Sequence, residues 1–314
     1  MLKAATIDIG SNSVKYLYIE YDANGIYAKG ERVEVTRLSE GLSQNGVLSS
    51  TAMQRTQRRV MQMVRELKSK HVRRIFIVGT MALRTAKNAS EFLTRMRDAR
   101  LPEVTILDGD EEARLGQVAV IGALHRQLGN HRYCIFDTGG GSTEFIVGEQ
   151  QDVNERKSLD LGVVDCTEKY LGRELPNRSS IMACEREIEQ TLDGIPVQNV
   201  DVLVGVGGTV TTLAATHLGI EPYDPGKIHG TTLTRADIQN LREQFLSLPL
   251  EARKNIPGLH PQRADVIIAG VLIVQSIMKK LRCKELVVSD AGLRLGVMID
   301  RLGLTGRTFQ YIGE

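Results

Sequence analysis

The sequence contains the same glycine-rich turn twice, first as Thr6-Ile7-Asp8-Ile9-Gly10-Ser11-Asn12-Ser13 and again as Ile135-Phe136-Asp137-Thr138-Gly139-Gly140-Gly141-Ser142-Thr143-Glu144. In each copy an Asp stands two residues before a Gly, a short loop of small residues ends in Ser, and a new apolar strand begins. Asp8 aligns with Asp137, Gly10 with Gly139 and Ser13 with Ser142. Two strands joined by so short a loop form a tight hairpin. The repeat therefore predicts two similar halves with a cleft between them.

Both turns have the properties of a phosphate-binding loop. Glycine lets backbone N–H groups come close to phosphate oxygens, because no side chain stands in the way. The Asp at each loop mouth supplies a hard oxygen ligand for Mg²⁺, the ion that usually accompanies polyphosphates. We therefore expect a phosphate chain to be held between the two loops.

The composition is that of an ordinary globular protein. At 314 residues the chain is long for one core, so two domains are expected. Hydrophobic residues make up 42% and charged residues 25%, and a net charge of +2 does not favour nucleic acid as the main partner. The polar stretch 129–132 leads into the second turn. We place the first domain at residues 1–128 and the second at 129–296, with a final helix at about 297–314 packing back on the first.

Cysteine usage and hydropathy predict a cytoplasmic protein. The N-terminus enters a strand almost at once, which leaves no room for a signal peptide. The longest apolar run, 266–274, is too short to cross a bilayer and is expected to form a buried helix. Widely spaced cysteines without a CxxC pair are expected to be reduced and mostly buried. They are Cys134, Cys166, Cys184 and Cys283.

Strand-like runs alternate with segments of helical periodicity, which indicates an α/β fold. Strands are expected at 4–9, 14–21, 26–35, 75–79, 104–107, 133–137, 143–147, 202–206 and 286–289. Helices are expected at 51–70, 111–128, 179–192, 210–218, 235–246, 263–280 and 292–302.

A pair of glutamates follows the strand at 104–107, in Gly109-Asp110-Glu111-Glu112-Ala113-Arg114-Leu115. Asp110 can cap the helix, and acidic residues in a first turn are commonly explained by the helix dipole. A carboxylate here could also orient a water for attack on a phosphoryl group. Because adjacent helical residues point about 100° apart, only one of Glu111 and Glu112 is expected to face the cleft.

Two further segments allow both a binding and a structural interpretation. Gly205-Val206-Gly207-Gly208-Thr209 joins a buried strand to a helix, whose N-terminal N–H groups could bind an anion or whose glycines could serve close packing. Its spacing does not match a Walker-type loop. Arg84 follows Gly79-Thr80 and could reach a phosphate, or it could be an ordinary surface arginine.

A basic run extends from Arg55 to Arg74, with eight Lys or Arg residues and a single acid, Glu66. A solvated helix face is one explanation, and a channel for a polyanion is the other. His229 and Arg263 are isolated polar residues near turns and indicate little on their own.

Taken together and in this order, these motifs resemble the exopolyphosphatase / guanosine pentaphosphate phosphohydrolase (Ppx/GppA) family of the actin-like ATPase superfamily, in its short two-domain form. The similarity runs from one end of the chain to the other. The matching segments are 5–13, 79–80 with 83–84, 109–115, 137–144, 205–209, 257–259, 263–267 and 289–296.

The resemblance implies an α/β protein of two actin-like (ribonuclease H-like) lobes, which hydrolyses a terminal phosphoanhydride with Mg²⁺ or Mn²⁺. It places the catalytic glutamate at Glu112 and metal ligands at Asp8, Asp137 and Glu144. The implied phosphate-binding residues are Gly10, Ser11, Asn12, Ser13, Arg84, Gly139, Gly140, Gly141, Ser142, Gly207, Gly208 and Thr209.

The sequence departs from the family pattern in two respects. It ends at Glu314, without the additional C-terminal helical domains of longer members, so processive action on very long chains is not expected. Asp108 replaces a small polar residue common in the family. Its carboxylate could alter metal or substrate preference, or simply cap a turn.

The first hypothesis is an exopolyphosphatase that releases orthophosphate from inorganic polyphosphate. The first alternative is hydrolysis of guanosine pentaphosphate at the same site, and the second is a nucleotide- or alarmone-binding regulator with little turnover. A sugar or acetate kinase on the same fold ranks lowest, because such kinases do not combine the Glu-Glu-Ala pair with the later segments. No specific nucleic acid or membrane is expected as a partner, and a homodimer stays open.

Overall fold

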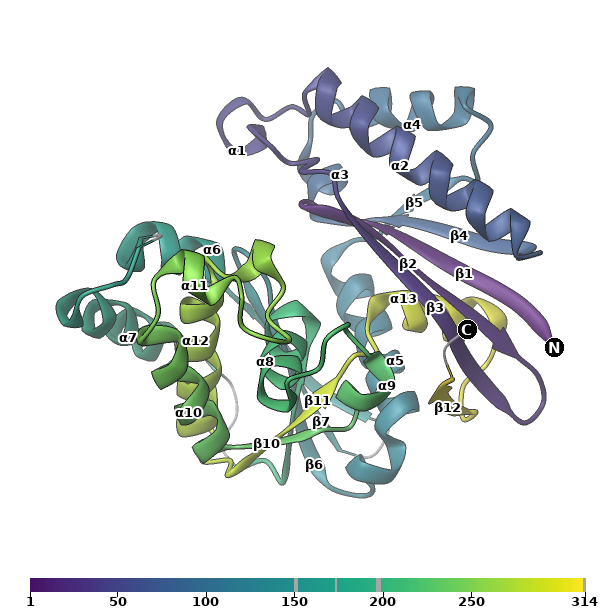
Figure 1. Ribbon diagram of the computed structural model, residues 1–314. Helices are drawn as coiled ribbons and strands as arrows, with labels where there is room; N and C mark the ends of the chain where they lie inside the picture. The colour runs from purple at the N-terminus through teal and green to yellow at the C-terminus, as the bar shows by residue number, and fades with distance from the viewer. Residues whose placement is uncertain (150–151, 173, 196–198, 313–314) are drawn as a thin grey trace. The chain divides into compact units, whose positions relative to one another are not determined.

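The computed structural model describes residues 1–149, 152–172, 174–195 and 199–312. The chain divides into two compact units (Figure 1). Unit 1 contains Met1–Ala123 and Ala291–Glu314, and unit 2 contains Leu124–Asp290. Helix α5 (Gly109–Leu128) crosses this division, and its backbone leaves the helical conformation at Leu124. The domain boundaries expected from the sequence lie at 128/129 and 296/297. The unit boundaries of the structure lie a few residues earlier, at 123/124 and 290/291.

Unit 1 is built on a six-stranded sheet in the order β12-β3-β2-β1-β4-β5. Strands β1 to β3 form an antiparallel meander, while β4 and β5 run parallel to β1. Their bounds are β1 Leu2–Ile9, β2 Ser13–Tyr21, β3 Gly25–Val35, β4 Arg74–Gly79, β5 Val104–Ile106 and β12 Thr308–Tyr311.

Unit 2 repeats five strands of this arrangement, in the order β8-β7-β6-β9-β11-β10. Its sixth strand, β10, pairs with β11, whereas β12 of unit 1 pairs with β3 at the meander edge. Again three strands form a meander from β6 to β8, and β9 and β11 continue parallel to β6. The bounds are β6 Arg132–Thr138, β7 Thr143–Glu149, β8 Asp152–Leu159, β9 Val202–Val206, β10 Thr232–Thr234 and β11 Glu285–Ser289. The shared order confirms the predicted α/β fold of two similar lobes.

Helices cover both faces of the unit 1 sheet. Alternate residues of a strand point to opposite faces, so Ile7 of β1 packs with α2 (Ser50–Ser69) and α4 (Ala89–Asp98). Ala4, on the other face, packs with α5 and with α13 (Leu293–Leu302). Asp8 alternates with Ile7 and therefore points to the side of α13. Two short helices, α1 (Leu42–Asn45) and α3 (Met81–Thr85), complete the unit.

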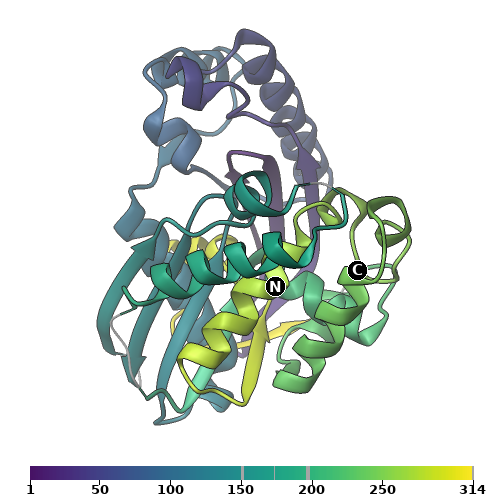
Figure 2. The ribbon, with the colours of Figure 1, turned by 90° about the vertical axis from the view of Figure 1, so that its left-hand side faces the viewer.

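In unit 2, α12 (Ile267–Lys280) packs between α7 (Arg178–Leu192) and α10 (Arg235–Leu246), as Figures 1 and 2 show. Nearly every α12 side chain is buried, which confirms the buried helix predicted for residues 266–274. Within the described residues, no helix combines the length and apolar character that a bilayer span requires. The remaining helical elements are α6 Val163–Cys166, η1 Thr167–Leu171, α8 Gly207–Leu218, α9 Pro225–Ile228, α11 Leu250–Arg253 and η2 Pro261–Arg263.

A charged cluster joins α2 to the meander of unit 1. The Glu66 carboxylate accepts hydrogen bonds from the Tyr16 hydroxyl at 2.5 Å and from Arg32 at 2.8 Å. Burial acts to raise the pKa of Glu66, but the bonds from Tyr16 and Arg32 outweigh it and hold this pKa below its ordinary value of 4.5. The ionised carboxylate therefore stabilises the folded state.

Glu66→Gln is expected to lower the free energy of unfolding by about 1 kcal/mol at pH 7. A depressed folded-state pKa contributes stability above the unfolded value of 4.5 and loses it as pH falls through the folded value. The difference between wild type and variant should therefore shrink between pH 5 and pH 3. Urea denaturation across this range measures it, and a difference that stays constant with pH would contradict the account.

Candidate active site

The two glycine-rich turns have the same hydrogen-bonded geometry. The Gly10 amide donates to the Ser13 carbonyl at 3.0 Å, and the Gly139 amide donates to the Ser142 carbonyl at 2.8 Å. Each turn joins the first two strands of its meander, β1 to β2 in unit 1 and β6 to β7 in unit 2. The hairpins predicted from the sequence repeat are therefore present in both units.

In each unit, a segment outside the loop donates backbone hydrogen bonds to the carbonyl groups of the loop. In unit 1 the amides of Thr36 and Arg37 both donate to the Asn12 carbonyl, at 2.9 and 2.8 Å. In unit 2 the amides of Val163 and Val164 donate to the carbonyls of Gly139 and Gly140, at 3.0 and 2.9 Å.

This support leaves amide groups at the loop tips available. The N–H groups of Ser11, Asn12, Gly140 and Gly141 donate no hydrogen bond within the part of the chain that the structure describes. Asn12, Gly140 and Gly141 are exposed, and Ser11 is half-buried. Each loop thus offers donors of the kind that bind phosphate oxygens.

Asp8 lies at the end of β1, directly opposite Lys15 of β2. Its Oδ1 atom is buried and has no hydrogen-bond partner among the described residues. Burial raises the pKa of Asp8, while the nearby charges of Lys15 and Arg294 act to lower it. A buried carboxylate oxygen without a partner is costly and fits a cation ligand.

Arg294 is fixed beside Asp8 by contacts to two strands. It donates to the Tyr16 carbonyl at 2.9 Å and forms an ion pair of 2.8 Å with Glu31. Arg294 stands in the segment 289–296 that matches the family, and the sequence alone indicates no role for it. Its position shows that it places a positive charge near the Asp8 carboxylate.

Asp137 and Glu144 lie directly opposite each other in the β6–β7 pair. Directly opposed residues in antiparallel strands point to the same face, with Cβ atoms about 5 Å apart. Glu144 accepts hydrogen bonds from the hydroxyls of Ser142, at 2.5 Å, and Ser158, at 3.2 Å. Asp137 and Glu144 therefore place two carboxylates on one face of the sheet in unit 2, while Asp8 belongs to unit 1. Among the described residues, no three His, Cys, Asp or Glu side chains gather to hold a metal ion.

The third glycine segment forms the beginning of α8, close to Asp137. Gly207 has φ +79°, and a Cβ atom there would collide with the Asp137 carboxylate. Arg263 donates to the carbonyl of Gly208 and to the Thr212 hydroxyl, the latter at 2.8 Å. The Thr209 side chain is buried and its hydroxyl donates to the Thr138 carbonyl at 3.1 Å, so it ties α8 to β6. Arg263, which the sequence left without a role, thus anchors this segment.

Gly207→Ala is expected to lower the free energy of unfolding by about 2 kcal/mol, from backbone strain and from the displaced Asp137 carboxylate. If Asp137 serves catalysis, phosphate release should also fall about tenfold. Gly219→Ala is the matched control at the other end of α8, because Gly219 has φ +62° and open space around it. It should cost only about 1 kcal/mol and leave turnover unchanged. Equal loss of turnover in both variants would contradict a special role for the Gly207 contact.

Arg84 and Glu112 form an ion pair of 3.2 Å in unit 1. Arg84 also donates to the Leu107 carbonyl at 2.8 Å, which fixes it at the end of β5. Glu111 is engaged elsewhere, since Arg114 binds both of its carboxylate oxygens, at 2.8 and 2.9 Å. Arg114 holds the pKa of Glu111 below its ordinary value. The two adjacent glutamates therefore have different partners.

The predicted cap of α5 is wrong by two residues. The Asp108 side chain, not that of Asp110, accepts a hydrogen bond from the Glu111 amide at 2.8 Å. The Asp108 carbonyl also accepts from the Glu112 amide at 3.0 Å. Of the two roles open to Asp108, capping is therefore the one that its contacts support.

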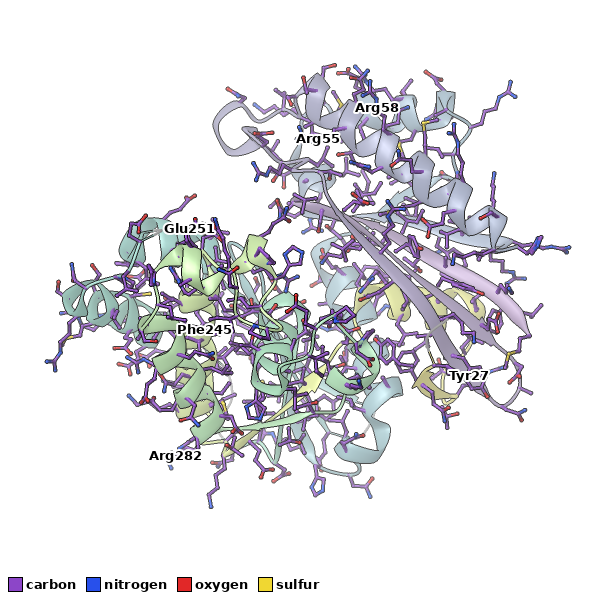
Figure 3. The ribbon with its side chains drawn as sticks, viewed as in Figure 1. Tyr27, Arg55, Arg58, Phe245, Glu251 and Arg282 are labelled. Carbon is purple, nitrogen blue, oxygen red and sulfur yellow. The ribbon has the colours of Figure 1, made fainter. Side chains whose placement is uncertain are left out.

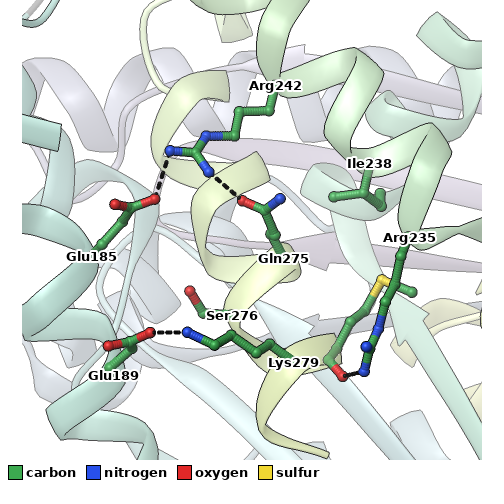
Figure 4. A pocket seen from close by; sticks show the side chains of 9 residues that line it. Glu185, Glu189, Arg235, Ile238, Arg242, Gln275, Ser276 and Lys279 are labelled. Carbon is green, nitrogen blue, oxygen red and sulfur yellow. Dashed lines mark hydrogen bonds and ion pairs between the residues drawn. The ribbon is translucent and has the colours of Figure 1, made fainter. Parts of the chain in front are cut away.

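A cavity of about 330 Å³ lies on unit 2 between α7, α10 and α12, and contains none of the predicted site residues (Figure 4). Four of its five charged groups form ion pairs. Arg242 contacts Glu185 at 2.7 Å, and Lys279 contacts Glu189 at 2.7 Å. Arg235, the fifth, donates to the backbone carbonyls of Cys283 and Met278, at 2.7 and 2.9 Å. All five charged groups are therefore already engaged by other groups of the protein.

Known proteins resemble this chain over nearly all of its length. Residues 20–305 match the model of the Ppx/GppA phosphatase family. Exopolyphosphatase 2 of Mycobacterium tuberculosis is 28% identical over 96% of this chain and 99% of its own length. A guanosine-5'-triphosphate,3'-diphosphate pyrophosphatase of Aliivibrio fischeri is 30% identical over 95% of this chain, which spans 59% of that longer protein. The crystal structure of the Aquifex aeolicus member of the Ppx/GppA family has 32% identity and a TM-score of 0.86, and covers 98% of this chain and 99% of its own.

Proposed function

Because the chain belongs to the Ppx/GppA phosphatase family, we propose that it hydrolyses the terminal phosphoanhydride of inorganic polyphosphate and releases orthophosphate. The observation that carries this proposal is the pair of matching loops. Among the described residues, each loop has backbone N–H groups that donate no hydrogen bond, and each follows a strand that ends near an Asp. We propose that both loops bind the same phosphate chain. The match to an exopolyphosphatase over 99% of that protein's length supports this substrate.

Guanosine pentaphosphate is the second candidate substrate. The similarity to a guanosine-5'-triphosphate,3'-diphosphate pyrophosphatase favours it, although this chain spans only 59% of that protein. The same loops would bind its phosphates. Guanosine pentaphosphate would in addition require a pocket for its nucleoside, which polyphosphate does not.

We propose that Asp8, Asp137 and Glu144 hold a divalent ion, Mg²⁺ or Mn²⁺, directly or through water. The unpartnered Oδ1 of Asp8 and the opposed pair in unit 2 fit such an ion, because oxygen ligands suit both metals. When bound, the ion would neutralise charge on the phosphoryl oxygens.

In the proposed reaction, Glu112 orients a water molecule in line with the terminal phosphorus and accepts a proton from it. The water oxygen forms a bond to that phosphorus while the bridging P–O bond breaks. Orthophosphate leaves, and the negative charge stays on the shortened chain. Arg84 positions Glu112 through their ion pair and can contact the phosphate at the same time. Amides of Ser11, Asn12, Gly140 and Gly141 stabilise the charge on the bound oxygens.

We further propose that the protein works in the cytoplasm. All four of its cysteines are free and buried, which fits a reducing compartment.

Phosphate release by the purified protein with Mg²⁺ or Mn²⁺ tests the substrate. Short polyphosphate, long polyphosphate and guanosine pentaphosphate are compared at equal concentration of phosphate ends. Faster release from polyphosphate is expected. Release from the nucleotide alone would assign the second candidate, and tight nucleotide binding without any release would point to a regulator.

A further inference from the structure

The outer face of α2 carries cations along its length. The buried side of this helix includes Met53, Val60 and Leu67. Arg58 and Arg65 lie on the opposite side, seven residues and therefore about 10 Å apart, and Lys68 follows within one turn. All three are exposed, and Figure 3 shows Arg58 on this helix.

The acids near α2 are already engaged with other cations. Glu66, the one acid of the basic run, binds Tyr16 and Arg32. Glu34 pairs with Arg32 at 2.6 Å. Glu40 pairs with Arg55 at 3.1 Å. Arg58, Arg65 and Lys68 thus form no ion pair within the described residues, so their charge is available to an anion.

This face begins beside the phosphate-binding loop of unit 1. Arg55 of α2 donates to the Thr36 carbonyl at 2.5 Å, and the amides of Thr36 and Arg37 hold the Asn12 carbonyl of the loop. Arg37 is exposed and has φ +46°. From there α2 runs to the far end of the sheet, where Lys3 of β1 donates to the Lys70 carbonyl at 3.2 Å. Exposed cations therefore continue from the loop along the whole helix.

We propose that Arg37, Arg58, Arg65 and Lys68 bind the part of a long polyphosphate chain that extends beyond the candidate active site. This proposal rests on the proposed function and adds a basis for chain-length preference. Arginine and lysine neutralise phosphate charge, and each phosphate bound releases counterions, so affinity should depend on salt. A chain too short to leave the active site gains nothing from this surface.

A single-stranded nucleic acid is the competing polyanion. Proteins that bind such strands without sequence preference stack the bases on aromatic side chains. Residues 50–70 contain no aromatic side chain. A ligand with charge but no bases therefore fits the α2 face better.

The test compares two triple variants with the same loss of charge. Arg58→Gln/Arg65→Gln/Lys68→Gln changes the α2 face and keeps good helix formers. Arg156→Gln/Arg282→Gln/Lys284→Gln removes three exposed cations from unit 2, of which Figure 3 labels Arg282. The α2 variant is expected to raise KM for long polyphosphate about tenfold and KM for tripolyphosphate less than about twofold, and to flatten the salt dependence. The control should change neither KM by more than about twofold.

Equal KM values for long polyphosphate in the two triple variants would overturn the proposal, as would an equal effect of the α2 variant on both chain lengths. A binding measurement separates this outcome from a failure of the proposed function. Fluorescence anisotropy of labelled long polyphosphate is measured in the Glu112→Gln background, with and without the α2 substitutions. Weaker binding in the α2 variant is expected even if no substrate is turned over. Displacement of the label by single-stranded RNA at equal charge concentration would assign the surface to nucleic acid instead.

Discussion

Glu112→Gln is expected to lower kcat for phosphate release from polyphosphate about a thousandfold and to leave KM within about threefold. Glutamine has nearly the shape of glutamate but cannot accept the proton of the attacking water. The amide can still contact Arg84, so the geometry at the end of β5 should persist. A loss in kcat without a change in KM is the signature of a group that acts in the transition state.

The adjacent glutamate provides the control. Glu111→Gln removes the same charge one residue away, but Glu111 binds Arg114, which in turn pairs with Asp300 of α13 at 2.9 Å. We expect kcat within about threefold of wild type and a loss of stability of at most about 1 kcal/mol. Steady-state phosphate release and urea denaturation of both variants measure this. Equal kcat losses in the two variants would show that neither glutamate has the role assigned here.

Asp8→Asn is expected to reduce phosphate release at least about a hundredfold while making the protein more stable by about 1 kcal/mol without metal. Burial of the Asp8 carboxyl raises its pKa, and Lys15 and Arg294 offset this only in part. A raised folded-state pKa means that ionising this carboxyl costs folding free energy. A neutral amide of the same size removes that cost, but it is a poor ligand for a divalent ion.

Thermal denaturation with and without Mg²⁺ separates the two effects. A metal that binds only the folded state raises its stability, so wild type should gain more from Mg²⁺ than Asp8→Asn. Lys87→Gln is a control, because it changes an exposed charge of unit 1 outside the loops. An Asp8→Asn protein that is less stable than wild type without metal, or that keeps wild-type turnover, would contradict the assignment.

Five of the six meander strands were predictable because their apolar residues are continuous or alternate clearly. β8 was missed, since Asn154, Glu155, Arg156 and Lys157 are exposed and only pairing with β7 makes the segment a strand. β12 was also missed, and the helix expected at about 297–314 is wrong beyond Leu302, where α13 ends. β12 is a four-residue strand whose pairing with β3 joins residues far apart in sequence. Strand pairing between distant segments has little effect on local composition, so such strands are hard to predict from the sequence.

The hydrophobic periodicity of the sequence predicted where helices lie but not the residues at which they begin. The helix predicted at residues 263–280 begins at Ile267, because Pro261–Arg263 forms a separate 3₁₀ turn. α8 begins at Gly207, three residues before its predicted start. There the glycine segment that looks like a loop begins the helix, with Gly207 at φ +79°.

The candidate site was predictable as a set of loops but not as a set of contacts. The repeat identified both hairpins, and the spacing of Glu111 and Glu112 indicated that they differ. Which glutamate contacts Arg84 depends on where β5 ends, because Arg84 also binds the Leu107 carbonyl there. That position is set by tertiary structure and cannot be read from the local sequence. Arg263 and Arg294 stand far from the loops in sequence. Only folding brings Arg263 to Gly208 and Arg294 to β2 beside Asp8.

Hydrolysis of polyphosphate in water enriched in oxygen-18 tests the central claim most directly. If water attacks the terminal phosphorus, each released orthophosphate carries one oxygen from solvent, and the shortened chain carries none. Mass spectrometry of the orthophosphate and of the remaining chains distinguishes these products. We predict label in orthophosphate from the first turnover onward, formed about a thousandfold more slowly by Glu112→Gln. Label in the remaining chains, or release of multi-phosphate fragments, would contradict terminal hydrolysis at this site.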